Sequence, residues 1–591
     1  MLFRSIKGGL WFTPYQNNTV YDFYVNGDFY FYGAGGSSYL NNDKAAFLIT
    51  LPDEFLQFGQ APSNIRTHNI GFFAQDEWRV TKRLTLNYGV RYEYSSPKVD
   101  TQGRSFSLAR GQQSTRFPNA PLGLLFPGDT GAPAGSNFPI KNNWAPRLGF
   151  AYDPTGDGKT SIRGGIGMFY DILKGEDNLQ FNGQAPFFGY ADLFFNPLDS
   201  NPTAEVNNMT QPYVAAGQTN PFPSKPPAKN IDFGNSGFLP FGGGGVYFVN
   251  PNLKTPYVFQ YNLSIQREVM KNMMAEASYI GSSSHELTGL VDSNPFILGT
   301  TTRLFNAPPG VPGNFSYLET FDNVGKAHYN SLALSLTRRT SEVKGLGSLM
   351  YQVSYTYGKS IDNSSGFRAR NSNVPYYNHN QFLAVSDYDL THYVSINASW
   401  ELPFGQWWSS GPARLTRGWT LYPVMSYRSG LPLDVFAGLS ASGSKPGPSA
   451  AGDQNLVRAN LVAPVTYFDP HTQQTLEGNP GNFYFDPAAF SYKEIVALGS
   501  APVTNPALRT YGTLGRNAFR GPTRTNVNLT IAKITPIWGE RVKSELRADF
   551  FNVLNHTQFD NPNLTITSPL FGQISSTGDP RIIQLAFRLT F

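Results

Sequence analysis

The sequence predicts an all-β fold, an antiparallel transmembrane β-barrel, on three observations. Long runs alternate apolar with polar residues, short and long connections alternate between the runs, and the composition is rich in aromatic residues. The 591 residues are 15% aromatic and only 15% charged, which excludes a disordered solvating chain. No stretch approaches about 18 consecutive apolar residues, so the predicted spans are strands and not helices.

Alternation with a period of two residues is the main signal. In residues 84–94 (LTLNYGVRYEY) the even positions are Leu, Leu, Tyr, Val, Tyr and Tyr, and the odd positions are Thr, Asn, Gly, Arg and Glu. Successive side chains of a strand point to opposite faces, so such a run predicts one apolar and one polar face. Residues 257–267, 349–357 and 394–402 repeat the pattern. Runs of roughly 9–12 residues suit a tilted membrane-spanning strand better than a soluble sheet.

The predicted strands follow one another along the whole chain. About 15 are expected, beginning near residues 3, 22, 68, 83, 144, 160, 255, 272, 327, 347, 389, 417, 523, 541 and 581. Residues 41–60 are expected to include a short helical or irregular insertion. The alternative is a large soluble β protein that buries its apolar faces in a core. The many Ser, Thr, Asn and charged residues gathered on one face argue against it.

The connections between the strands fall into two classes that alternate along the chain. The short ones are residues 80–83, 153–160, 268–272, 339–347 and 535–540. The long ones are rich in Gly, Pro, Asn and Ser and cover residues 95–143, 173–254, 282–326, 359–388 and 429–522. Membrane barrels sort their connections in this way, with tight turns on the inner side and long loops outside.

Composition excludes several classes of function. The net charge of +5 comes from 46 basic and 41 acidic residues spread along the chain, so no nucleic-acid footprint is expected. Cysteine is absent, which excludes disulfide frameworks, thiolate zinc sites, iron–sulfur clusters and cysteine nucleophiles. The seven His residues show no metal-ligand spacing, and we expect no metal and no cofactor.

Three short motifs resemble parts of catalytic signatures and fail on inspection. Gly158-Lys159-Thr160 lacks the first glycine of a phosphate loop, because position 153 is Asp. His285-Glu286 is followed by Gly289 where a zinc protease needs His. The string from Ser442 to Lys445 matches S-x-x-K without the partner motifs of that enzyme class. The sequence therefore predicts that the protein is not an enzyme.

Five blocks of sequence resemble the barrel of TonB-dependent receptors, and most closely the Oar-like branch. They are residues 72–94 (FFAQDEWRVTKRLTLNYGVRYEY), 144–171 (WAPRLGFAYDPTGDGKTSIRGGIGMFYD), 514–522 (LGRNAFRGP), 547–563 (RADFFNVLNHTQFDNPN) and 571–591 (FGQISSTGDPRIIQLAFRLTF). Residues 1–67 resemble the preceding barrel strands more weakly. The last strand ends on Phe591, and a terminal aromatic strand is typical of the assembly signal of bacterial outer-membrane proteins.

This resemblance implies a location and a set of partners. It implies the bacterial outer membrane, a barrel of about 22 strands, a plug before it, and uptake of a scarce large solute driven through TonB. The sequence shows no signal peptide, TonB box or plug. We therefore interpret residues 1–591 as an incomplete barrel, the C-terminal part of a receptor. The expected partners are outer-membrane lipid, the barrel-assembly machinery, an extracellular solute, and the TonB complex through the missing N-terminal region.

Charged residues on the polar faces are the candidate site residues. They would line the interior of a closed receptor, where they could contact a plug or the solute, or solvate one another. They are Arg91, Glu93, Glu545, Arg547, Asp549 and Arg588, with Lys543 beside them. Residues 371–382 (NSNVPYYNHNQF) show how Tyr and Asn in the long loops could serve recognition.

The sequence leaves three functional hypotheses. The first is an energised receptor for a large solute of the siderophore, oligosaccharide or peptide class. The second is a structural or adhesive outer-membrane barrel without energised transport. The third is a secreted β-rich enzyme or binding module, which detergent dependence would distinguish from a membrane barrel.

Overall fold

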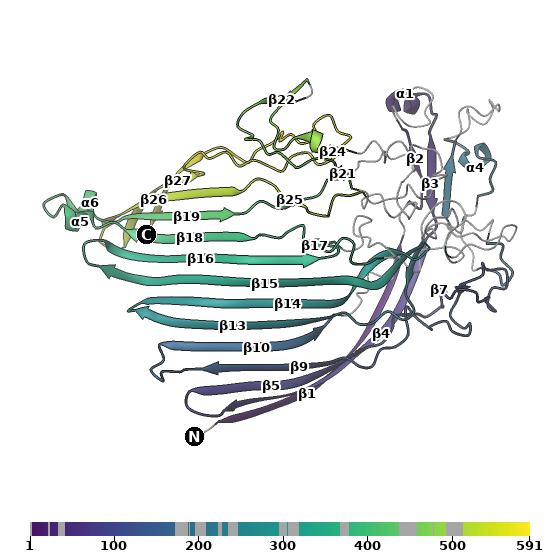
Figure 1. Ribbon diagram of the computed structural model, residues 1–591, viewed down its shortest axis with the longest axis horizontal. Coiled ribbons are helices and arrows are strands. Elements are labelled where there is room, and N and C mark those ends of the chain that lie inside the picture. The colour runs from purple at the N-terminus through teal and green to yellow at the C-terminus, as the bar shows by residue number, and fades with distance from the viewer. Residues whose placement is uncertain are drawn as a thin grey trace.

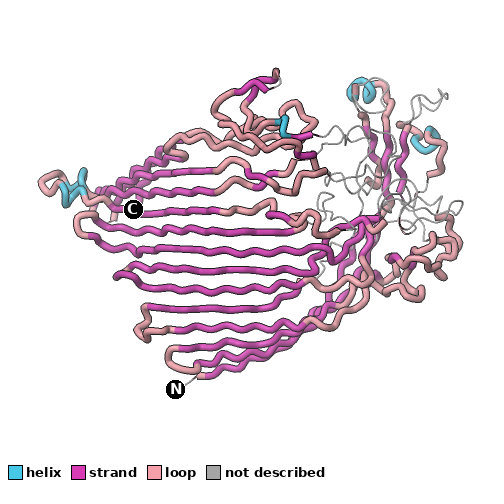
Figure 2. The backbone as a smooth tube through the Cα atoms, viewed as in Figure 1, coloured by secondary structure: helices cyan, strands magenta, loops and turns pink. Residues whose placement is uncertain are grey.

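The computed structural model describes most of the chain, and Figure 2 draws the remaining residues in grey. The described residues are 3–21, 24–32, 42–171, 187, 190–195, 209–220, 222, 227–233, 246–294, 304, 318–366, 378–435, 458–476, 478–491, 512–539 and 541–591. Among them, no helix is long and apolar enough to cross a membrane.

One curved antiparallel sheet dominates the described part of the chain (Figure 1). It has 17 strands, of which β6 (Val99–Asp100), β12 (Val246–Val249) and β17 (Ala384–Val385) are short. The long strands are β1 (Arg4–Tyr21), β4 (Ala61–Arg79), β5 (Leu84–Ser95), β9 (Trp144–Tyr152), β10 (Thr160–Tyr170), β13 (Tyr257–Met270), β14 (Met273–Asp292), β15 (Leu318–Val343), β16 (Gly347–Asp362), β18 (His392–Glu401), β19 (Trp419–Arg428), β26 (Arg524–Trp538), β27 (Val542–Phe551) and β28 (Ile582–Thr590).

Each long strand pairs with its neighbours in chain order, from β1–β4 through to β27–β28. Within the described ranges, β1 pairs only with β4 and β28 only with β27, so the sheet is not closed. The fold class predicted from the sequence is confirmed: an all-β antiparallel sheet whose barrel is incomplete.

The strand register carries the two faces of each strand across the whole sheet. Leu86 of β5 lies opposite Trp78 of β4 and Phe150 of β9, whereas Asn87 lies opposite Glu77 and Gly149. Directly opposite residues share a face, so the apolar rows join into one surface and the polar rows into the other.

The exposure of the two faces is inverted relative to a soluble protein. On the apolar face, Leu585 is 78% exposed and Phe587 is 65% exposed, whereas Asp549 and Ser331 on the polar face are buried. A soluble sheet would bury its apolar face in a core. The exposed apolar face of this sheet is therefore the one that meets lipid.

Among the charged residues on the apolar face, Asp76 and Arg4 form a group near the end of β4. Asp76 accepts hydrogen bonds from Nε of Arg4 and from the hydroxyl of Tyr88, each at 2.7 Å. Arg4 also lies 5.9 Å from the ring centre of Trp78. Such pairing lowers the cost of charge close to the membrane interface.

The connections are sorted between the two ends of the strands (Figure 2). Tight turns join β4 to β5, β9 to β10, β13 to β14 and β15 to β16 at one end, where both chain termini also lie (Figure 1). Between β18 and β19 this end carries α5 (Phe404–Trp407) and α6 (Ala413–Thr416). Gly347 closes one turn with φ +77, and a Cβ there would lie 2.3 Å from the carbonyl oxygen of Glu401.

The long connections lie at the other end and contain their own small elements. These are β2 (Asp28–Tyr30), α1 (Asp43–Leu48), β3 (Glu54–Phe58), β7 (Ser107–Leu108), β8 (Leu124–Leu125), β11 (Tyr190–Phe194), α4 (Pro212–Ala215), β20 (Pro432–Leu433), β21 (Asn460–Leu461), β22 (Gln474–Leu476), β23 (Asn479–Gly481), η4 (Pro487–Ala489), β24 (Phe490–Ser491) and β25 (Phe519–Arg520).

The two largest apolar clusters of the described residues lie mainly in these connections. One cluster packs Phe117, Leu124, Phe126 and Phe233 against Leu318. A second gathers residues of the last two long connections, namely Leu433, Val435, Ala459, Phe485, Ala489, Phe490, Leu514, Phe519, Ile566 and Phe571. The connections thus fold by burying apolar side chains, as soluble domains do.

Most strand positions predicted from the sequence are confirmed, and one is wrong. The strand expected to begin near residue 22 is not part of the large sheet. Its described part is the short strand β2, which pairs with β3, which in turn pairs with β11, in a separate three-stranded sheet. Phe29 packs on Phe55 with ring centres 4.6 Å apart, so these aromatics form a loop core instead of a lipid-facing row. The insertion expected in residues 41–60 is confirmed by α1.

We predict that Leu263→Arg destabilises the folded barrel by about 2–4 kcal/mol, because Leu263 sits midway along β13 on the lipid face. Ser264→Arg, one residue further on the polar face, is the matched control and should change stability by about 1 kcal/mol or less. Urea unfolding from lipid vesicles measures both. Equal costs for the two variants would contradict the assignment of the faces.

Candidate functional site

The polar face carries the charged residues singled out in the sequence. Arg91 and Glu93 are both on β5 and form an ion pair. The guanidinium of Arg91 also lies 5.4 Å from the ring centre of Trp11 on β1. A Cβ on Gly71 would come within 2.4 Å of the Trp11 indole nitrogen, so the absence of a side chain at Gly71 makes room for this stacked group.

The other charged residues gather on β27 and β28, close to the opposite edge of the sheet. Nη2 of Arg547 lies 2.9 Å from Oδ1 of Asp549, which also accepts a hydrogen bond from Thr530. Glu545 stands directly opposite Arg588, and Lys543 opposite Thr590. The structure thus forms two separate charged groups, one on β5 and one on β27–β28. Phe591 lies beyond the end of β28 and is 94% exposed.

Two cavities open along the sheet. One, of about 380 Å³, includes Arg91 and Arg147 in its lining, over the small residues Gly89 and Gly149. The other, of about 600 Å³, includes Arg428 and Arg524, which stand directly opposite each other on β19 and β26. Like charges at directly opposite positions destabilise a sheet unless an anion lies between them or pairs with one of them. Here Arg524 forms an ion pair with Asp560.

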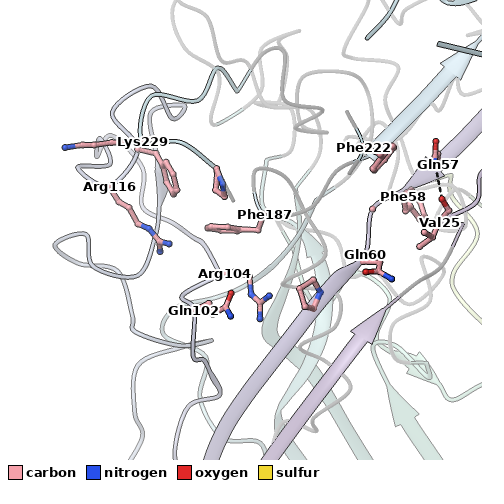
Figure 3. Close-up of a pocket in the computed structure, with 14 residues that line it drawn as sticks. Val25, Gln57, Phe58, Gln60, Gln102, Arg104, Arg116, Phe187, Phe222 and Lys229 are labelled. Atoms are coloured by element: carbon pink, nitrogen blue, oxygen red, sulfur yellow. Dashed lines mark hydrogen bonds between the residues drawn. The ribbon is translucent and has the colours of Figure 1, made fainter. Parts of the chain in front are cut away.

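The candidate binding site is a cavity of about 960 Å³ among the long connections. Three connections meet there, and Figure 3 shows Phe187 between Arg116 on one side and the wall of Phe58 and Gln60 on the other. Its lining consists of Val25, Gln57, Phe58, Gly59, Gln60, Pro62, Gln102, Arg104, Arg116, Phe117, Phe187, Phe222, Pro227 and Lys229. Over the described residues, the lining therefore combines phenyl rings, amides and cationic side chains without a carboxylate.

The two arginines of this cavity differ in their partners. Arg104 pairs with Asp100, with Nη2 and Oδ2 2.9 Å apart. Arg116 instead donates from Nη1 to the backbone oxygens of Gly103 at 2.8 Å and Pro127 at 3.3 Å. Burial lowers the pKa of Arg116, and the attraction of Asp129 offsets this only in part. Among the described residues, the side-chain hydrogen bonds of Arg116 thus go to backbone oxygens and not to a carboxylate.

Asp129 fixes the connection that carries Arg116. Its carboxylate accepts hydrogen bonds from the hydroxyls of Ser114 and Thr115 and from the backbone N–H groups of Thr115, Arg116 and Phe126. Burial alone would raise the pKa of Asp129, but these hydrogen bonds outweigh it and hold the pKa below its ordinary value.

A second cluster of charges holds the last long connections to the sheet. Arg516, 8% exposed, lies 2.7 Å from Asp362 and 2.9 Å from Asp387, and Arg520 pairs with Asp389. Asn517 donates to the backbone oxygen of Val385 at 2.7 Å. Burial opposes the ionised form of Asp387, yet Asn517 and Arg516 keep its pKa below the ordinary value.

The rejected motifs and the loop positions are placed as follows. The turn before Gly158 is capped by Asp153, which accepts from the N–H groups of Gly156 and Gly158 at 2.8 and 3.0 Å, so Gly158-Lys159-Thr160 is a turn between β9 and β10. The Ser442–Lys445 string lies outside the described residues, as do residues 371–377. Over the described ranges, no group of three or more His, Cys, Asp or Glu is placed to hold a metal ion.

The comparisons with known proteins agree on the class of this protein. A family model described as "Outer membrane beta barrel domain" matches residues 4–584. The TonB-dependent transporter Oar of Myxococcus xanthus is 22% identical over 298 residues, which cover 50% of this chain and 24% of that protein.

Two solved structures align with this chain at low identity. The outer membrane transporter YddB from Escherichia coli aligns with a TM-score of 0.37 and 11% identity over 91% of this chain and 52% of that one. The siderophore receptor PirA from Acinetobacter baumannii aligns with a TM-score of 0.38 and 8% identity over 99% of this chain and 55% of that one. The chain thus spans about half of these structures and a smaller share of the curated relative. All three are named as transporters or receptors.

We predict that Arg516→Met loosens the last long connections, because it leaves Asp362 buried without its cation, a change that costs about 3–5 kcal/mol. Proteinase K should then cleave within residues 458–491 faster than in the unchanged protein. Arg414→Met, in α6 at the other end of the sheet, is the control and should leave cleavage unchanged. An unaltered rate in Arg516→Met would show that the cluster does not hold this region.

We predict a pH-dependent opening of the connection around Asp129. The pKa of Asp129 is lower in the folded state than in the unfolded state. Its carboxylate therefore contributes fully to the stability of the connection above the unfolded pKa of about 3.9, and this contribution is lost as the pH falls through the folded pKa. At neutral pH, Asp129→Asn should lower the local free energy of opening by about 2 kcal/mol.

Hydrogen exchange of residues 103–131, corrected for intrinsic rates at each pH, measures this opening. Asp43→Asn in α1 is the control and should have no effect in this segment. The same acid sensitivity in the Asp129→Asn variant as in the unchanged protein would contradict the assignment.

Proposed function

The chain belongs to the family of outer-membrane β-barrel domains, and on that premise we propose that it forms most of the wall of a receptor that takes up a large solute with energy supplied through TonB. Its place is the bacterial outer membrane. The observation that carries the proposal is the combination of a cavity of about 960 Å³ among the long connections with a polar face below it. A purely structural barrel has no need of such a cavity.

The unpaired edges of the sheet support a larger barrel. Hydrocarbon offers no hydrogen-bond partners, and each unpaired backbone group there costs several kcal/mol. We propose that further strands of the receptor lie between β28 and β1 and pair with both edges. Closure would turn the polar face into a lumen and the apolar face into the lipid contact.

In a closed barrel, the charged residues of the polar face would line the lumen. We propose that Arg91 and Glu93 on β5, and Glu545, Arg547, Asp549 and Arg588 on β27 and β28, contact a plug or the passing solute. The two groups lie near opposite edges of the sheet, so they would hold a plug from two sides. Phe591, exposed at the end of the last strand, is proposed as the contact with the barrel-assembly machinery.

We predict that deletion of this gene and deletion of tonB abolish depletion of the same organic solute from the growth medium of the native bacterium. Comparison of the spent media of both strains with that of the parent by mass spectrometry identifies the solute, and the restored gene is the control. Depletion that persists without TonB would favour a pore without energised transport. Loss of surface attachment alone, with unchanged media, would favour an adhesive barrel.

A further inference from the structure

The extracellular cavity has a lining of unusual charge. It contains Arg104, Arg116 and Lys229, and none of the lining residues that the structure describes is acidic. Arg104 is neutralised by Asp100 from outside the lining, so Arg116 and the exposed Lys229 supply the remaining positive charge of the described lining. A concave site lined by one sign of charge raises the local concentration of ions of the opposite sign.

The guanidinium of Arg116 is held in place and still has donors to offer. It lies 5.2 Å from the ring centre of Phe117 and 5.4 Å from that of Phe187, so two phenyl rings fix its position. Its two side-chain hydrogen bonds to described residues both leave from Nη1 and go to backbone oxygens. A guanidinium has five N–H donors, so Nε and Nη2 remain for a carboxylate, which they match in geometry.

The walls of the cavity suit a flat apolar group. Phe58, Phe117, Phe187 and Phe222 come from three different connections and all reach the lining. Aromatic rings pair best with other rings, in offset or edge-to-face arrangements. A volume of about 960 Å³ lies at the upper end of the range for small-molecule sites.

We propose that this cavity binds an organic anion that carries an aromatic ring, with its carboxylate on Arg116 and its ring against Phe187 and the neighbouring phenyl groups. This inference rests on the proposed receptor function and adds the chemistry of the solute. Gln60 and Gln102 supply amide groups that can hold further polar atoms of the ligand.

The two cavities along the sheet also contain arginines. Each contains a pair of arginines, Arg91 with Arg147 in one and Arg428 with Arg524 in the other. Arg147 also lies 4.3 Å from the ring centre of Phe169, which repeats the combination of guanidinium and phenyl ring. Each of these linings also holds an aspartate, Asp76 in one and Asp579 in the other, so their charge differs from that of the cavity among the long connections.

The test is binding of 2-naphthoate to the full-length gene product in detergent, measured by isothermal titration calorimetry. Two probes separate charge from shape: 2-naphthylmethylammonium keeps the ring and reverses the charge, and cyclohexanecarboxylate keeps the charge without an aromatic ring. We expect 2-naphthoate to bind at least about tenfold more tightly than either. Its affinity should fall when salt is raised. Equal binding of all three probes, or none by 2-naphthoate, would overturn the proposal.

Two substitutions in the lining test whether 2-naphthoate binds in this cavity. Arg116→Gln should weaken binding of 2-naphthoate at least about tenfold, and Arg110→Gln, exposed on the same connection, is its control. Because Arg116 also supports its own connection, Gln102→Glu provides a second variant that adds a negative charge at an exposed lining position and should weaken binding too. Gln112→Glu is its control. Unchanged affinity in both lining variants would contradict the site.

The outcome separates this inference from the receptor function. Suppose that 2-naphthoate fails to bind, while the same solute remains in the medium of both the gene deletion and the tonB deletion. The proposed chemistry of the solute is then wrong, and the receptor function stands. If 2-naphthoate binds through Arg116 while uptake is independent of TonB, the site is right and the energised mechanism is wrong.

Discussion

The structure depends on one constraint, which is that every backbone N–H and C=O group within the hydrocarbon must find its partner inside the sheet. The long antiparallel strands meet this requirement from β4 to β27, where each strand is paired on both sides. Once the backbone is satisfied, side chains alone decide what each face contacts. Exposed leucine and phenylalanine on one face, with buried aspartate and serine on the other, follow from a sheet placed between lipid and water.

The connections obey a different rule, because they lie in water. They bury phenylalanine and leucine in cores of their own and attach to the sheet through Arg516 and Arg520. These contacts give the connections a defined arrangement, and Asp129 does the same for the segment that carries Arg116. The proposed solute site therefore stands on packed, hydrogen-bonded loops above a membrane-type sheet.

The sequence was most informative where structure is local and periodic. Period-two alternation and the parity of the connections predicted the long strands of the sheet, and the alternation of residues 84–94 gave the faces of β5 correctly. The strand predicted near residue 22 was wrong because alternating aromatics over a few residues cannot reveal whether they face lipid or a loop core. The cavity around Arg116 was missed for a related reason. Its lining comes from three connections without periodicity, and only the folded chain brings Phe58, Arg116 and Phe187 together.

The sequence contains no cysteine, so any introduced cysteine is the single reactive thiol. This makes it possible to test directly which face of the sheet contacts lipid. Single cysteines at Leu86, Val353 and Leu585, and at the adjacent Asn87, Ser354 and Gln584, can be probed in lipid vesicles with a reagent confined to the bilayer. If the apolar face meets lipid, the first three cysteines are labelled and the second three are not. Labelling of Asn87, Ser354 and Gln584 in place of their neighbours would contradict this assignment of the faces.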